Sequence, residues 1–157
     1  MSRLSAGLAN EVATLDERVV TLGTGTTTLD PAKHANRLLL IATAAAAYTI
    51  NLPEAVGSGD VYEFLVTVAH TSGTITINAK STNGSNVFVG MITNHGSANV
   101  VTKFASTTND IITLNNTTTG GQAAGDYLEI VDSAVDTWTI IGGLFSTSGT
   151  QATPFSG

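Results

Sequence analysis

The sequence predicts an all-β protein: a jelly-roll-like antiparallel β-sandwich or barrel with a short helical arm at its N-terminus. The chain has 157 residues, the usual length of one domain. It contains 26 threonines, and many of them alternate with Val, Ile or Leu, as in half-buried strands. Short alternating segments recur between Gly, Asn and Ser turns, which is the spacing of a β-sandwich.

The first 35 residues follow a different period, and we predict that they form an N-terminal arm. Apolar residues spaced by four, three, four and three form a heptad seam, which indicates one short amphipathic helix. The seam consists of Leu8, Val12, Leu15, Val19 and Leu22. A helix of roughly fifteen residues is marginal alone in water, so the seam needs a surface to lie against. Copies of itself, its own β-domain and another protein all remain open as that surface.

After the helix, "GTGTTTLDP" is polar and Gly-rich, and we interpret it as a linker. The β-domain is expected over residues 36–145, and residues 146–157, "STSGTQATPFSG", have the composition of an extended tail. Alternation within the β-domain predicts which side chains face inward. These are Tyr48, Ile50, Leu52, Tyr62, Phe64, Val66, Val68, Ile75, Ile77 and Ala79. Further strands are expected in "NVFVGMI", "ANVVTKFA", "DIITLNN", "DYLEIVD" and "TWTIIGG".

A closing hairpin is predicted in "GDYLEIVDSAVDTWTIIGGLF", which contains the only tryptophan. Leu128 and Ile130 share a face, and Trp138 is expected to pack in the core beside them. A sugar-stacking platform is the alternative for Trp138. Asp132 and Asp136 flank the turn "SAV" and are expected to accept backbone N–H bonds. A Ca²⁺ ion held by these two carboxylates and turn carbonyls is the other possibility.

The composition argues against several function classes. Only 11% of residues are charged and the net charge is −6, so the chain lacks the basic stripe that nucleic acid requires. It has no cysteine for a disulfide, a thiolate site or a thiol nucleophile. His34, His70 and His95 do not stand at metal-ligand spacing. No lysine of a phosphate loop follows "GTGTTT", and no G-x-S-x-G elbow is present. We therefore expect no enzyme activity, no cofactor and no metal.

The sequence also bears on membranes and location. Its longest apolar run, "LLLIATAAAAY", is too short to span a bilayer, and the N-terminus lacks the apolar stretch of a secretory signal. We expect a soluble chain that is made in the cytoplasm of its producer and has no membrane partner.

Three elements of the β-domain bear a resemblance to a known family. They are T-I-x-L-P at residues 49–53, G-D-x-x-x-F-x-V at residues 59–66, and G-D-x-x-x-I with W-x-x-x-G between residues 125 and 142. Their order over residues 36–145 resembles a recurrent β-domain of tailed-bacteriophage virion proteins, found in capsid decoration (cement) proteins and in head or tail fibres. The resemblance implies a homotrimer of jelly-roll-like domains on a virion, with no catalytic residues.

The expected function is therefore that of a capsid decoration protein, assembled in the host cytoplasm. It would bind the outer capsid surface as a trimer, with the major capsid protein as partner, and stabilise the head. Arms that cross subunit boundaries would hold neighbouring capsomers together, with docking through the heptad seam. The alternative is a tail-fibre or receptor-binding module for host surface carbohydrate, which needs exposed aromatic rings in a groove. Aromatic residues make up only 6%, and most fall on inward positions. A surface lectin-like domain is a third possibility, which the missing signal disfavours.

Overall fold

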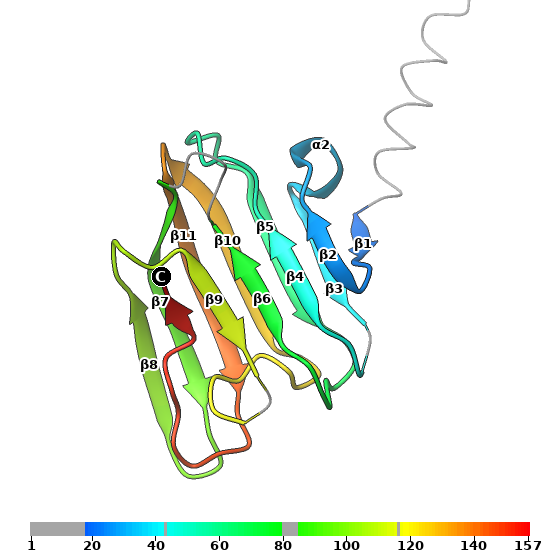
Figure 1. Ribbon diagram of the computed structural model, residues 1–157, viewed down its shortest axis with the longest axis vertical. Coiled ribbons are helices and arrows are strands. Elements are labelled where there is room, and N and C mark those ends of the chain that lie inside the picture. The colour runs from blue at the N-terminus through cyan, green and yellow to red at the C-terminus, as the bar shows by residue number, and fades with distance from the viewer. Residues whose placement is uncertain (1–17, 43, 80–84, 116) are drawn as a thin grey trace, which may run out of the picture.

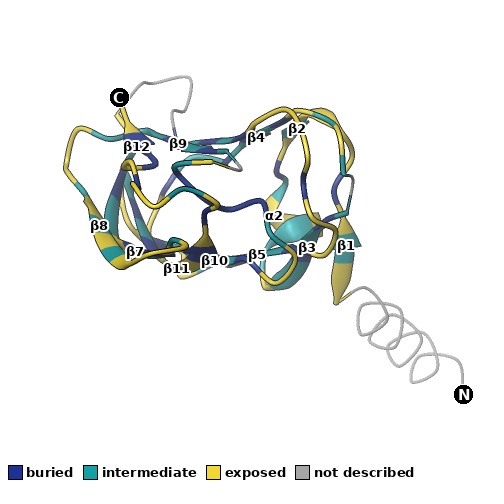
Figure 2. Cartoon of the chain, turned by 90° about the horizontal axis from the view of Figure 1, so that it is seen from below, coloured by how far each residue is buried: buried dark blue, intermediate teal, exposed yellow. Residues whose placement is uncertain are grey.

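The computed structural model describes residues 18–42, 44–79, 85–115 and 117–157, and they form a two-layer β-sandwich (Figure 1). The predicted all-β class is confirmed. The larger sheet has seven strands, in the spatial order β1 (Val19–Thr21), β3 (Arg37–Ile41), β5 (Val61–Val66), β10 (Tyr127–Ala134), β11 (Thr137–Phe145), β7 (Val87–His95) and β8 (Val100–Ala105). The smaller sheet has five, in the order β12 (Phe155–Ser156), β9 (Ile111–Leu114), β6 (Ile75–Asn78), β4 (Tyr48–Asn51) and β2 (Gly25–Thr28). Figure 2 shows the two layers from their edge.

The first half of the chain winds back and forth between the two sheets. Strands β1, β3 and β5 lie side by side in the larger sheet, and β2, β4 and β6 lie side by side in the smaller one, all in parallel pairs. Five of the ten strand pairs that the structure describes are parallel. The predicted antiparallel jelly roll is therefore wrong in its pairing. Each connection crosses to the other sheet, so consecutive strands of one sheet run in the same direction.

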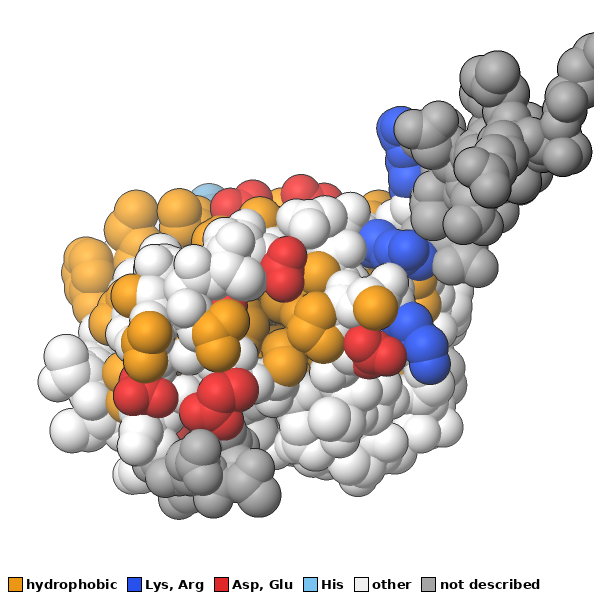
Figure 3. Space-filling model, turned by 90° about the horizontal axis from the view of Figure 1, so that it is seen from above, with side chains coloured by type: hydrophobic (Ala, Val, Ile, Leu, Met, Phe, Trp, Pro, Cys, Tyr) orange, Lys and Arg blue, Asp and Glu red, His pale blue; other side chains and the backbone are white. Residues whose placement is uncertain are grey.

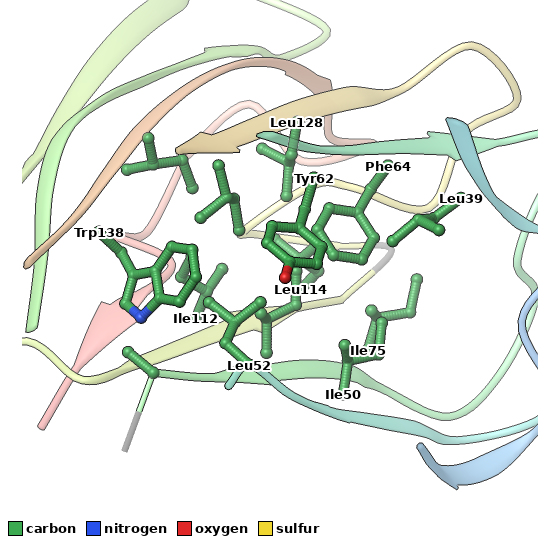
Figure 4. Packing of buried hydrophobic residues seen from close by; sticks show 14 of the residues in the cluster. Leu39, Ile50, Leu52, Tyr62, Phe64, Ile75, Ile112, Leu114, Leu128 and Trp138 are labelled. Atoms are coloured by element: carbon green, nitrogen blue, oxygen red, sulfur yellow. The ribbon is translucent and has the colours of Figure 1, made fainter. Parts of the chain in front are cut away.

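The core lies between the sheets and is built from the positions that alternation predicted. Of the ten side chains predicted to face inward, nine are at most 4% exposed, and the exception is Val68, at 42%. Val68 is exposed because β5 ends at Val66. Trp138 is fully buried and meets the Tyr62 ring edge-on, with ring centroids 5.7 Å apart (Figure 4). Burying one large apolar side chain contributes about 1.5–3 kcal/mol, so these residues are the main source of stability.

The N-terminal part of the described chain belongs to the sandwich, which corrects the predicted arm. Val19 begins β1, which pairs with β3, and Leu22 is 4% exposed in the core. These two seam residues are therefore not in a helix, because the β-branched segment "VVT" pairs with the edge of the larger sheet. Leu8, Val12 and Leu15 lie outside the described residues. The predicted linker is also wrong, since Gly25–Thr28 forms β2 beside β4.

The predicted tail is part of the sandwich as well. Phe155 pairs with Ile112 in the smaller sheet and is 5% exposed. The Thr113 N–H donates to the Pro154 carbonyl at 2.8 Å, and Gln151 is buried. The boundaries at residues 35 and 145 therefore do not separate arms from a body. A single helix is described, α2 (Pro31–His34), and it is capped by the Asp30 side chain.

Candidate functional site

The most distinctive surface is an apolar patch on the outer side of the larger sheet, over β7, β8 and β11. We call it the apolar face, and it consists of Met91 (43% exposed), Val100 (58%), Phe104 (70%), Ile141 (55%) and Phe145 (43%). Met91 pairs with both Phe104 and Ile141, so these three form one row across the strands. His95 pairs with both Val100 and Phe145 in a second row. Exposed apolar side chains gathered in this way mark binding surfaces.

Among the described residues, no Asp, Glu, Lys or Arg side chain interrupts this patch. Between its two rows, Thr93 pairs with Thr102 and Gly143, so the middle of the face is small and uncharged. The buried neighbours Ile92 and Ile140 alternate with these residues and point into the core. An uncharged patch that carries aromatic rings is typical of the core of a protein interface.

An acidic pair borders the apolar face. Glu63 on β5 pairs with Glu129 on β10, and Glu129 in turn pairs with Ile141. The Tyr127 hydroxyl donates to Glu129 Oε2 at 3.3 Å. Burial, with the charges of Glu63 and Glu129, raises the pKa of Tyr127 to about 12, so the phenol stays protonated near neutral pH. Like charges directly opposite each other on a sheet are destabilising, so this pair favours solvent over burial.

Basic side chains gather at the other edge of the same sheet. Arg18 and Arg37 line a surface hollow of about 580 Å³ that reaches Glu63 and Glu129. Figure 3 looks onto one end of the sandwich and shows hydrophobic side chains at its left and centre and Lys and Arg side chains at its right. On the outer side of the larger sheet, the acidic pair on β5 and β10 is followed by the apolar face on β11, β7 and β8, and the two arginines lie at the β1 edge.

Asp132 in the closing hairpin has a structural role. Its carboxylate accepts hydrogen bonds from the backbone N–H groups of Val56 (3.2 Å), Gly57 (2.7 Å) and Ser58 (3.0 Å), and from the Ser58 hydroxyl (2.8 Å). Burial opposes ionisation, but these bonds outweigh it and lower the pKa of Asp132. The prediction that this residue accepts backbone N–H bonds is confirmed, and both of its oxygens are occupied. Asp136, the proposed second calcium ligand, lies in the turn with φ 59°.

Asp126, at the start of the same hairpin, is also a structural carboxylate. It is 6% exposed and accepts hydrogen bonds from the N–H groups of Ala123 (2.8 Å) and Phe145 (2.9 Å). Burial raises its pKa, and the backbone hydrogen bonds only partly oppose this. Asp126 therefore fixes the loop before β10 to the end of β11.

The other sequence candidates do not converge on a site. Trp138 is fully buried, so the sugar-stacking alternative is wrong. His34 ends α2, His70 is buried beside the Tyr48 ring, and His95 ends β7. Within the described ranges, no three His, Asp or Glu side chains are grouped as metal ligands. In that same part of the chain, no helix is long and apolar enough to cross a membrane.

Sequence reasoning missed both the apolar face and the partners of Asp132. A signal for the face was present: Met91, Phe104 and Ile141 fall on the solvent phase of alternating strands. It was overlooked because the strand order that brings them together is not local in sequence. No family model, curated protein or solved structure matches this chain.

Proposed function

We propose that the protein is a virion structural protein, a capsid decoration protein that binds the outer capsid surface as a homotrimer and stabilises the head. The observation on which the proposal depends is the apolar face on the outer side of the sandwich. A monomeric protein rarely exposes so many neighbouring apolar side chains without a binding role. A decoration protein that bridges the subunits of a shell needs a binding surface of this kind.

The elements behind the family resemblance support the same proposal. T-I-x-L-P places Ile50 in β4, G-D-x-x-x-F-x-V places Phe64 in β5, and the closing motif places Trp138 in β11. All three side chains are buried in one core. The motifs therefore specify the packing of the sandwich, as expected if they mark a domain type rather than a catalytic site.

The docking surface in this proposal differs from the one expected from the sequence. Val19 and Leu22 belong to the sandwich, so the seam that could dock is reduced to Leu8, Val12 and Leu15. The apolar face is a second surface available for neighbouring copies or for the major capsid protein. Multivalent attachment through several such surfaces gives tight binding from weak single contacts.

The decisive experiment locates the protein on particles. The protein, detected with antibodies raised against the purified chain, should co-sediment with virions in a density gradient. The same antibodies, conjugated to gold, should label heads. Particles stripped of the protein should release their nucleic acid at a lower temperature than particles to which it has been added back. Absence of the protein from purified virions would refute the proposal.

A receptor-binding role in a tail fibre remains the second candidate, and one observation favours it. Phe104 and Phe145 are 70% and 43% exposed, although most aromatic side chains lie inward as expected. Exposed rings on a flat face can stack on sugars. This candidate predicts gold label on tails, and glycan binding that is lost in Phe104→Ala. Label confined to heads would exclude it.

A further inference from the structure

We propose that the apolar face is the interface between copies of this chain, which associate through it in the absence of any other component. This inference concerns the purified protein and does not depend on the proposed role in a virion. Its basis is the position, size and charge of the surface formed by Met91, Val100, Phe104, Ile141 and Phe145.

The size of the face fits association between copies. The exposed parts of its five side chains amount to about 500 Å², near the top of the range of about 300–600 Å² for the largest patch on a monomer. Thr93 and Thr102 lie between the two rows and His95 lies in the second row, so these side chains add polar area within the face. Their exposed area adds to that of the five apolar side chains toward the roughly 800 Å² that each partner contributes to a standard interface.

The sheet edge beside the face is protected, so the contact is between faces rather than between strands. Lys103 pairs with the buried Ile92, so its side chain lies on the inner side of the edge strand β8. Inward-pointing lysines on edge strands oppose the addition of another strand. Phe104, the next residue, points outward and is 70% exposed. The structure therefore blocks the edge of β8 and leaves its outer side open.

The charges on the larger sheet limit how two copies can overlap. Stacking the whole sheets in the same strand order would enclose four carboxylates, from Glu63 and Glu129 of each copy, and buried unpaired charges are costly. Contact confined to the apolar face avoids this arrangement and leaves the acidic pair in solvent. The apolar faces of two copies can therefore meet without enclosing these carboxylates.

If residues 1–17 form the predicted arm helix, they do not reach across the face, because they join the chain at the opposite edge. Arg18 precedes β1, and six strand spacings of about 4.8 Å separate β1 from β8, which is about 29 Å. A helix of 17 residues is about 25 Å long, so the predicted arm helix would end before it covered the face. The C-terminus is already placed, since β12 pairs with β9 in the other sheet. A second copy is therefore the occupant that this chain supplies.

The test compares two equally exposed apolar residues. Phe104 lies on the face and Val135 lies in the β10–β11 turn, and each is 70% exposed. In sedimentation equilibrium through the micromolar range, the wild type should have two or three times its chain mass of 16.0 kDa. Phe104→Glu should raise the dissociation constant at least about 100-fold, whereas Val135→Glu should leave it unchanged. Phe104→Thr, which suits an edge strand, serves the same purpose if the glutamate variant folds poorly.

A covalent readout is available because the chain has no cysteine. Met91 is the middle residue of its row, so Met91→Cys should form a disulfide-linked dimer in air, far more than Val135→Cys does. A wild type that sediments at 16.0 kDa throughout the micromolar range would overturn the proposal. So would an oligomer that Phe104→Glu does not dissociate, or one that Val135→Glu dissociates equally. None of these measurements involves a particle, so they stand apart from the test of decoration.

Discussion

Replacing Asp132 by Asn tests how the closing hairpin is attached to the loop before β5. The two side chains have the same shape, but the amide offers one acceptor oxygen where the carboxylate offers two. That oxygen can keep the three bonds made at Oδ2, from the N–H of Val56 and from both the N–H and the hydroxyl of Ser58. The amide NH₂ group then faces the Gly57 N–H, whose 2.7 Å bond to Oδ1 is lost.

The size of the effect follows from the number of bonds. A hydrogen bond to a charged group contributes about 1.5–3 kcal/mol, and one to a neutral group about 0.5–1.5 kcal/mol. Losing the Gly57 bond and weakening the other three amounts to about 5 kcal/mol, of which the easier burial of a neutral amide offsets a part. We expect the free energy of unfolding to fall by about 3 kcal/mol, and the melting temperature by about 6–12 °C for a chain of this length.

The pH dependence gives a second signature. Because the folded-state pKa of Asp132 is lowered, its carboxylate contributes stability above the unfolded-state value of 3.8, and this contribution is lost as the pH falls through the folded-state pKa. The difference between wild type and Asp132→Asn should therefore be full at neutral pH and should shrink below 3.8.

Urea denaturation, followed by the fluorescence of the single buried tryptophan, measures this difference. Asp136→Asn is the matched control, because it makes the same charge change in the same hairpin and Asn accepts the φ of 59° found there. If Asp132→Asn unfolds at the wild-type urea concentration, or if the control loses as much stability, the tethering role of Asp132 is wrong.

Three further predictions concern the core, one glycine and the second buried carboxylate. Trp138→Ala should lower the free energy of unfolding by about 3–5 kcal/mol in urea denaturation, and wild-type stability would mean that the indole is not core packing. Gly90→Ala should cost about 3 kcal/mol or more in thermal unfolding, because φ is 117° and a Cβ would meet the Ile140 carbonyl; Gly143→Ala, where no atom lies within 4 Å, should cost less than about 1 kcal/mol. Burial raises the folded-state pKa of Asp126, so its contribution is present below 3.8 and is lost as pH rises through the folded-state value. The stability of the wild type relative to Asp126→Asn should thus decrease with rising pH in denaturation curves, the opposite trend to Asp132, and an increase would contradict it.

The sequence predicted the strands in which apolar and polar residues alternate, and it missed strands in which no such alternation is visible. Ile75 and Ile77 face inward as expected, because apolar and polar residues differ clearly in "GTITINA". In β2, "GTTT", every side chain is polar or absent, so nothing distinguished it from a linker. What makes it a strand is its parallel pairing with β4, a tertiary interaction that local composition does not encode. Phe155 was missed for the same reason, since its partner Ile112 lies far away in sequence.

The prediction that the heptad seam is helical was wrong at Val19 and Leu22 for a different physical reason. Val19 and Leu22 fit a helical period, but β-branched Val19 and Val20 also suit a strand, and a short apolar segment fits both patterns. This segment forms a strand and not a helix because the edge of β3 offers β1 a parallel partner. The candidate site shows the same limit. The sequence placed Asp132 in the hairpin and foresaw its backbone acceptor role, but its donors in residues 56–58 are more than seventy positions away.

Because β1 to β6 wind between the two sheets, the length of the sandwich can change at one side without a change in the apolar face at the other. Within the winding, each turn pairs with the turn beside it, and the last turn, β5 and β6, also pairs with β10 and β9. Units of stacked-repeat proteins pair in the same way and can be gained or lost at an end. In the described chain, β1 and β2 are the outermost strands of their sheets on this side. The apolar face lies at the other side, on β7, β8 and β11. A chain of this fold could therefore gain or lose a whole turn while the residues of the apolar face stay the same.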